Sequence, residues 1–198
     1  PRTIKRTMTI NNEKFWELNY NSPDHNNEYK FYQNFATFSK TFTFDDLSNS
    51  LEEESVTSNV LNKVDSTNVF QSVFQARSVN YADNLSILHG EIDTIFNSEQ
   101  IVSDSDLFFS LTSNSASLEH TEDYDCFYLN LLGSFYLIMN NTTQIVGIGD
   151  AFYIPQGASY HVIGSTPFII FSFGLRGDVS RYYPWDNETT STTPPETS

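Results

Sequence analysis

The stretch at residues 149–161 reads Gly149-Asp150-Ala151-Phe152-Tyr153-Ile154-Pro155-Gln156-Gly157-Ala158-Ser159-Tyr160-His161. Its apolar run, residues 151–154, lies between a Gly-Asp pair and a Pro-x-Gly turn, which is typical of a short buried strand. A second strand is expected to begin directly after the turn, at residue 160. The stretch therefore predicts two strands joined by a tight turn, with His161 at the start of the second.

Short strands separated by turns continue on both sides of this stretch. Gly133-Ser134 and Asn140-Asn141 are natural turn dipeptides, because Gly and Asn tolerate positive φ and Ser and Asn bond to the nearby backbone. Regular spacing of this kind is typical of a β-sandwich or barrel. The predicted strands span residues 106–112, 124–131, 135–139, 144–148, 151–154, 160–164 and 168–175.

The strand predicted over 124–131 has two distinct faces. Because side chains alternate along a strand, its even-numbered residues share one face and its odd-numbered residues the other. If the face that carries His120 and Glu122 points inward and the phase continues, the even set lines the interior and the odd set packs outside. The even set is Tyr124, Cys126, Tyr128 and Asn130, and the odd set is Asp125, Phe127, Leu129 and Leu131.

Two histidines and a carboxylate could bind one metal ion. In an extended chain the side chains of His120 and Glu122 point to the same side, so both can reach a single ion, and His161 would supply the third ligand. Two His and one carboxylate leave coordination positions open, as in non-haem Fe(II) oxygenases. A structural zinc site would need four protein ligands, and Cys126 is the only cysteine.

At these residues the chain resembles the JmjC and cupin-like oxygenases, especially protein hydroxylases of the ribosomal-oxygenase type. The family pattern of His, any residue, an acid and then Tyr-Asp-x-Phe is similar to His120-Thr121-Glu122-Asp123-Tyr124-Asp125-Cys126-Phe127. The resemblance continues through Leu131-Leu132-Gly133 and the 149–161 stretch, and upstream through residues 107–112. It covers roughly residues 105 to 175 and implies a mainly β fold, a double-stranded β-helix of the cupin or jelly-roll type.

The resemblance implies an Fe(II)- and 2-oxoglutarate-dependent oxygenase that hydroxylates a protein or small-molecule substrate. His120, Glu122 and His161 would be the metal ligands. Glu122 stands where the family usually has Asp, and Glu can still ligate. The alternative is a cupin-fold binding or structural protein, with or without a metal, that does not use 2-oxoglutarate.

The cosubstrate site departs from the family pattern. The family has a Lys or Arg just past the glycine of the following strand, where this chain has Ser134, Phe135 and Tyr136. No Lys or Arg occurs between Arg77 and Arg176. A buried dicarboxylate without a cation is costly. Arg176, at the end of the last predicted strand, is the candidate substitute, since a guanidinium binds a carboxylate bidentately.

Thr112 and Tyr128 have hydroxyl groups that could also bind the cosubstrate. Each candidate residue has a structural alternative. His120 and His161 could be hydrogen-bonded core histidines, Thr112 and Tyr128 could serve packing alone, and Arg176 could cap a strand at the surface. Cys126 is expected to be a core residue, and His25 and His89 are expected to be structural or exposed.

Composition restricts the partners. The net charge of −15 disfavours nucleic acids and anionic membranes, whereas a basic protein partner and a homo-oligomer both stay open. The first six residues are not followed by an apolar signal core, no run is long enough to cross a bilayer, and a single cysteine allows no internal disulfide. These features lead us to expect a soluble, intracellular (cytoplasmic) protein.

Three regions are expected along the chain. Residues 1–104 should form a helical and strand region that packs on the barrel, with helices beginning at Asn11 or Asn12 and at Thr43 and another over 82–96. Residues 105–183 should form the barrel core. Residues 184–198, rich in Thr, Pro and Ser, are expected to be disordered.

Overall fold

The computed structural model describes residues 8–11, 28–52, 62–63, 73–76, 85, 89–90, 105–117, 119, 121 and 125–175. Its elements, in chain order, are β1 (Met8–Ile10), β2 (Lys30–Tyr32), β3 (Ala36–Phe38), α1 (Phe44–Leu51), β4 (Asn62–Lys63), β5 (Phe74–Ala76), β6 (Asp106–Ser110), β7 (Ser115–Ala116), β8 (Asp125–Leu132), β9 (Phe135–Met139), β10 (Thr142–Val146), β11 (Ala151–Ile154), β12 (His161–Gly164) and β13 (Phe168–Leu175).

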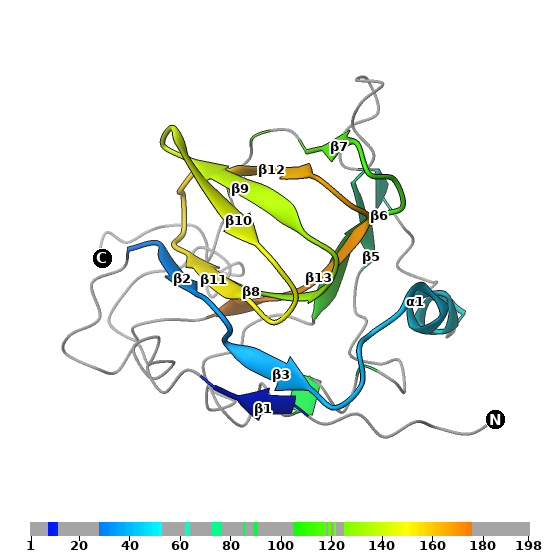
Figure 1. Cartoon of the computed structure of the whole chain (residues 1–198). Coiled ribbons are helices and arrows are strands. Elements are labelled where there is room, and N and C mark those ends of the chain that lie inside the picture. Colours follow the sequence, from blue (N-terminus) through cyan, green and yellow to red (C-terminus); the bar gives the residue numbers. More distant parts are fainter. Residues whose placement is uncertain are drawn as a thin grey trace, which may run out of the picture.

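Two larger sheets form the body of the protein (Figure 1). The seven-stranded sheet has the order β2-β11-β8-β13-β6-β5-β4, and the four-stranded sheet has the order β10-β9-β12-β7. From β6 to β13 the chain passes repeatedly from one sheet to the other, and within each sheet the neighbours pair antiparallel. This winding is a double-stranded β-helix, as the sequence predicts.

The N-terminal region contributes strands to the barrel sheet. β2 pairs with β11, and β5 pairs with β6. Both helices and strands were expected in this region. Thr43 caps α1 through a capping box with Asp46, as expected. Leu85, His89 and Gly90 are helical, whereas the rest of segment 82–96 and the helix expected after Asn11 lie outside the described residues, as does the 184–198 tail. Only one complete helix is found in the described part, where a few were expected.

The strand alternation expected for residues 124–131 is confirmed for the described residues of β8. Cys126 and Tyr128 belong to a buried cluster shared with β9 and β12 of the four-stranded sheet. Phe127, Leu129 and Leu131 belong to a second cluster on the opposite face of the seven-stranded sheet. We call the first cluster the barrel interior and the second the outer cluster.

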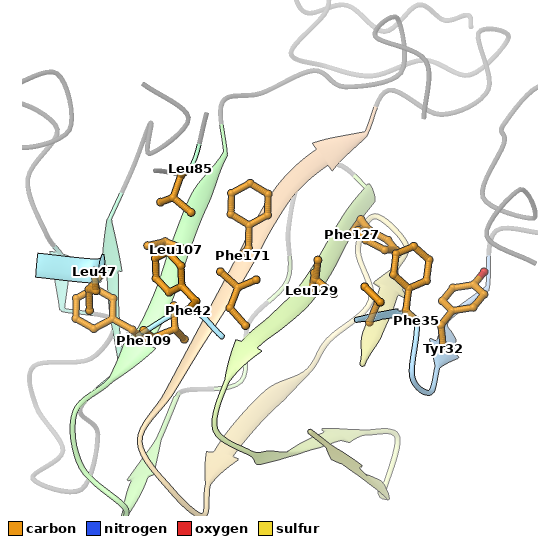
Figure 2. Close-up of a cluster of buried hydrophobic side chains, with 14 of the residues drawn as sticks. Tyr32, Phe35, Phe42, Leu47, Leu85, Leu107, Phe109, Phe127, Leu129 and Phe171 are labelled. Carbon is orange, nitrogen blue, oxygen red and sulfur yellow. The ribbon is translucent and has the colours of Figure 1, made fainter. Parts of the chain in front are cut away.

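The outer cluster is covered by N-terminal segments. Figure 2 shows Phe127, Leu129 and Phe171 of the sheet together with Phe35 and Leu47. Leu47 is a buried residue of α1 and Phe35 lies just before β3. The sheet is therefore buried on both faces, which explains why β8 reads as a nearly continuous apolar run.

Turn chemistry sets the register of the β9–β10 hairpin. Asn140 and Asn141 have φ angles of 50° and 65°, and Met139 pairs with Thr142 across them. Positive φ at both central residues defines the two-residue turn that suits the twist of a hairpin. β10 therefore starts directly after the turn and spans 142–146, not the predicted 144–148.

The other predicted strands agree closely with the structure. β9, β11 and β13 have the predicted bounds. β6 ends at Ser110, two residues early, while β8 and β12 begin one residue late. Among the described residues, no helix is long and apolar enough to cross a membrane.

We expect Gly149→Ala to lower the free energy of unfolding by about 2 to 4 kcal/mol, because it combines a strained backbone with a clash. Gly149 has φ +86°, and a Cβ there would lie 2.3 Å from the Ala36 carbonyl oxygen. Gly157→Ala is the matched control, since Gly157 has φ +85° with no atom within 4 Å of the added Cβ. Urea denaturation of both variants measures the difference. Equal losses would show that the contact with Ala36 is unimportant.

Candidate functional site

The Gly149-Asp150 pair anchors the N-terminal region to the barrel. The Ala36 N–H donates to the Gly149 carbonyl at 3.0 Å, and the Asp150 carboxylate accepts from the N–H groups of Asn34 and Gly147 at 2.6 and 2.8 Å. Because a side chain at residue 149 would collide with Ala36, glycine is required for this approach. This part of the motif therefore determines the fold.

Asp125 connects the two halves of the sequence motif. Its side chain is fully buried at the start of β8, and its Oδ1 accepts the backbone N–H of Gln156 at 2.6 Å. Gln156 lies in the Pro-x-Gly turn between β11 and β12, so the bond fixes the turn that precedes His161. The acid of the Tyr-Asp-x-Phe pattern is thus a positioning residue.

Residues 115–117 and Glu119 lie beside the chain at residues 159–164, which includes His161. β7 pairs with β12, and beyond the ladder the Ser117 N–H donates to the Val162 carbonyl at 3.0 Å. Further along, the Ser159 hydroxyl donates to Glu119 Oε2 at 2.7 Å. These contacts bring the residue preceding His120 close to the residue two before His161. His120 and Glu122 themselves lie outside the described residues.

His161 is half-buried at the first position of β12. Its Nδ1 atom is buried and has no hydrogen-bond partner among the described residues. A buried imidazole nitrogen normally bonds to a polar group or a metal ion, so the atom is chemically suited to be a ligand.

The register of β12 determines which way His161 points. Val162 lies opposite Leu137 and both belong to the barrel interior, whereas His161 lies opposite Ile138. Because side chains alternate, His161 is on the outer face of the four-stranded sheet, and Tyr160 points into the barrel.

Tyr160 was not singled out by the sequence analysis. Its hydroxyl contacts the hydroxyl of Tyr128, and both residues are buried. Tyr128 also stacks on Phe152 with ring centroids 4.7 Å apart. The sequence does contain a signal for Tyr160: side chains alternate along a strand, so Tyr160 and Val162 are expected to share a face.

The two hydroxyl residues proposed for the cosubstrate lie in different environments. Tyr128 is in the barrel interior, whereas Thr112 is exposed in the turn after β6, where its Oγ1 lies 3.4 Å from Ser110 Oγ. Arg176 follows β13 and lies outside the described residues. Within residues 105–175, which include β6 to β13, the sequence has no Lys or Arg.

A metal and 2-oxoglutarate fit the described residues to different degrees. His161 offers one suitable donor for a metal, but no cluster of three His, Cys, Asp or Glu side chains is found in the described part of the chain. The interior offers 2-oxoglutarate the hydroxyls of Tyr128 and Tyr160, but β6 to β13 contain no Lys or Arg.

His89, which was expected to be structural or exposed, is half-buried and contacts the Ser105 hydroxyl through Nδ1. Cys126 is buried, as expected of a core residue.

Solved structures with a similar fold include a ribosomal oxygenase. Escherichia coli ribosomal oxygenase YcfD has a TM-score of 0.61 and 16% identity, over 90% of this chain and 55% of YcfD. The structure of YcfD in complex with cobalt and 2-oxoglutarate gives a TM-score of 0.59 and 15% identity, over 86% of this chain and 56% of that one. An RmlC-like cupin from Shewanella frigidimarina gives a TM-score of 0.38 and 9% identity, over 57% of this chain and 84% of the cupin.

The YcfD similarities show that the two proteins share a fold, the double-stranded β-helix of the cupin type. This chain spans about half the length of YcfD. No family model matches the sequence, and no curated protein sequence matches it.

Burial raises the pKa of Tyr29 to about 12. Tyr29 packs partly buried against the barrel interior, just before β2. The unfolded phenol has a pKa of about 10, so the stabilisation from keeping it neutral is complete below about pH 10 and is lost as the pH rises towards 12.

We therefore expect the unfolding free energy of the wild type to fall relative to that of Tyr29→Phe as the pH rises above about 10. Denaturant titrations of both proteins at several pH values give this difference. Tyr136→Phe serves as a control, since Tyr136 lies on an exposed surface. A wild-type curve parallel to that of Tyr29→Phe would contradict the assignment.

Proposed function

We propose that the chain is an Fe(II)- and 2-oxoglutarate-dependent oxygenase that hydroxylates a protein or small-molecule substrate. The observation that supports it best is the β7–β12 pairing with the Ser159–Glu119 hydrogen bond, which brings the neighbours of His120 next to those of His161. The cobalt and 2-oxoglutarate complex of YcfD, a protein of the same fold, adds support.

The three proposed metal ligands share one face if the extended chain continues past β7. Ser117 bonds to Val162, an interior residue, so residues 120 and 122 would then have the opposite phase and lie with His161 on the outer face of the four-stranded sheet. Antiparallel neighbours are about 5 Å apart, and diagonal ones about 7 to 8 Å, so in this arrangement His120 and His161 would be within reach of one ion.

The bound metal would supply Lewis-acid and redox chemistry with open positions for cosubstrate and oxygen. The chain's own residues hold and shield this centre. Asp125 fixes the turn before β12, and the burial of His161 Nδ1 limits access of water to the donor atom. Arg176, directly after β13, is proposed to pair with the distal carboxylate of 2-oxoglutarate. The positions of Thr112 and Tyr128 add no support for their cosubstrate role.

Metal binding is the first test. We expect Co(II) or Fe(II) to bind with 1:1 stoichiometry in calorimetry, and His120→Ala or His161→Ala to weaken binding by about 10- to 100-fold, since each removes one ligand. His25→Ala is the matched control, as a histidine outside the proposed site. Unchanged affinity in both ligand variants would exclude this centre.

Cosubstrate use is the second test. The Fe(II)-loaded protein should bind 2-oxoglutarate and, with O2 as the oxidant, convert it to succinate and CO2. Arg176→Ala should weaken 2-oxoglutarate binding by about 10- to 100-fold through loss of a charge-assisted pair. Arg181→Ala controls for a general loss of positive charge. A metal-loaded protein that does not bind 2-oxoglutarate would reject the oxygenase proposal while leaving the metal site intact.

The second candidate is a cupin-fold binding or structural protein that does not use 2-oxoglutarate. Two observations favour it: Tyr160, not His161, faces the barrel interior, and residues 78–175 have no Lys or Arg. In this case Tyr160 is a core residue. Tyr160→Phe should then cost about 1 kcal/mol of unfolding free energy by removing one hydroxyl contact, and metal affinity should not change. A changed metal affinity would assign Tyr160 a role at the centre.

A further inference from the structure

The outer face of the four-stranded sheet has a row of exposed apolar side chains. Ile145 pairs with Tyr136, Tyr136 with Ile163, and Ile163 with Ala116, so one row crosses all four strands. Three of these side chains are large and apolar and yet exposed to solvent: Ile145 by 62%, Tyr136 by 38% and Ile163 by 39%. We call these four residues the apolar row.

The part of this surface formed by β9, β10 and β12 has no charged side chain, although the protein is strongly acidic. The chain has a net charge of −15, yet Asp150 is the only charged residue in 126–175. The outward positions of β9, β10 and β12, read from the strand pairing, contain no Asp, Glu, Lys or Arg; they are Tyr136, Ile138, Thr143, Ile145, His161 and Ile163. Two like-charged copies can approach here without bringing acidic side chains together, because charges farther away are screened within about 8 Å at physiological salt.

β10 forms an open edge of this sheet. In the described structure its only strand partner is β9. Its sequence, Thr142-Thr143-Gln144-Ile145-Val146, contains none of the features that usually protect an edge, such as a lysine, a proline or a bulge. A two-residue hairpin turn makes Met139 and Thr142 a hydrogen-bonded pair, so the backbone groups of Thr143 and Ile145 point away from β9.

We propose that two copies of this chain associate through β10, paired antiparallel about a two-fold axis centred on Gln144. Thr143 of one copy then lies opposite Ile145 of the other, and the outward N–H and C=O groups of both are satisfied. This register keeps side chains of the same face together, so the two apolar rows lie on one continuous outer surface, offset by two residues, with the two Ile145 side chains diagonal to each other. The contact is isologous and closes as a dimer.

The size of the contact makes the dimer weak. Only one five-residue edge strand of each copy pairs, a contact about 17 Å long that leaves the outer faces of both sheets uncovered, whereas a standard stable interface buries about 800 Å² per partner. Association is therefore expected in the micromolar range or weaker. It should strengthen with added salt, which screens the repulsion between the acidic copies.

Sedimentation velocity of the full chain over a range of concentrations tests this directly. We expect a monomer–dimer equilibrium that Ile145→Lys and Ile145→Glu each weaken at least about tenfold, because both remove an apolar contact and put a charge on the edge. Leu111→Lys is the matched control, since Leu111 is 59% exposed in the β6–β7 turn, away from the row. Substitution at such exposed positions should leave the fold intact, and circular dichroism checks this.

Hydrogen exchange gives an independent measurement. The amides of Thr143 and Ile145 should become protected as concentration rises, while that of Leu111 should not. A monomer at every concentration, or a dimer that the Ile145 variants do not weaken, would overturn the proposal. Association that weakens with salt would instead indicate pairing of opposite charges and would also overturn it.

Discussion

The burial of β8 on both faces is the constraint on which the rest of the structure depends. One face needs the four-stranded sheet as cover, and the other needs α1 and the residues around β3. Its neighbours β11 and β13 alternate in the same way, with Phe152 and Ile170 inside and Tyr153 and Phe171 outside. A central strand of this kind forces both the winding of the chain and the docking of the N-terminal region.

Much of the barrel could be predicted from the sequence because its signals are local. The Asn140-Asn141 turn, the Pro-x-Gly turn and the alternation along β8 each depend on a few adjacent residues. β2 and β7 could not be predicted in this way. β7 has only two residues, and β2 is held by pairing with β11, a contact between residues over a hundred positions apart in the chain.

The candidate site was less predictable than the fold, since several motif residues maintain the architecture. Gly149 allows the close approach of Ala36, Asp150 binds two backbone N–H groups, and Asp125 fixes the turn before β12. A sequence match at such positions is therefore stronger evidence for the barrel fold than for a particular chemical activity. The orientation of Tyr160 and His161 depends on the register of β12 with β9, which emerges only from pairing. The roles of His120, Glu122 and Arg176 stay predictions.

The proposed centre requires that two imidazoles bind the same ion. X-ray absorption of the Co(II)-loaded protein tests this most directly, because imidazole rings give a characteristic outer-shell scattering that can be counted. The account predicts two histidine ligands per cobalt in the wild type and one in His161→Ala. A wild-type spectrum with one imidazole or none would contradict it.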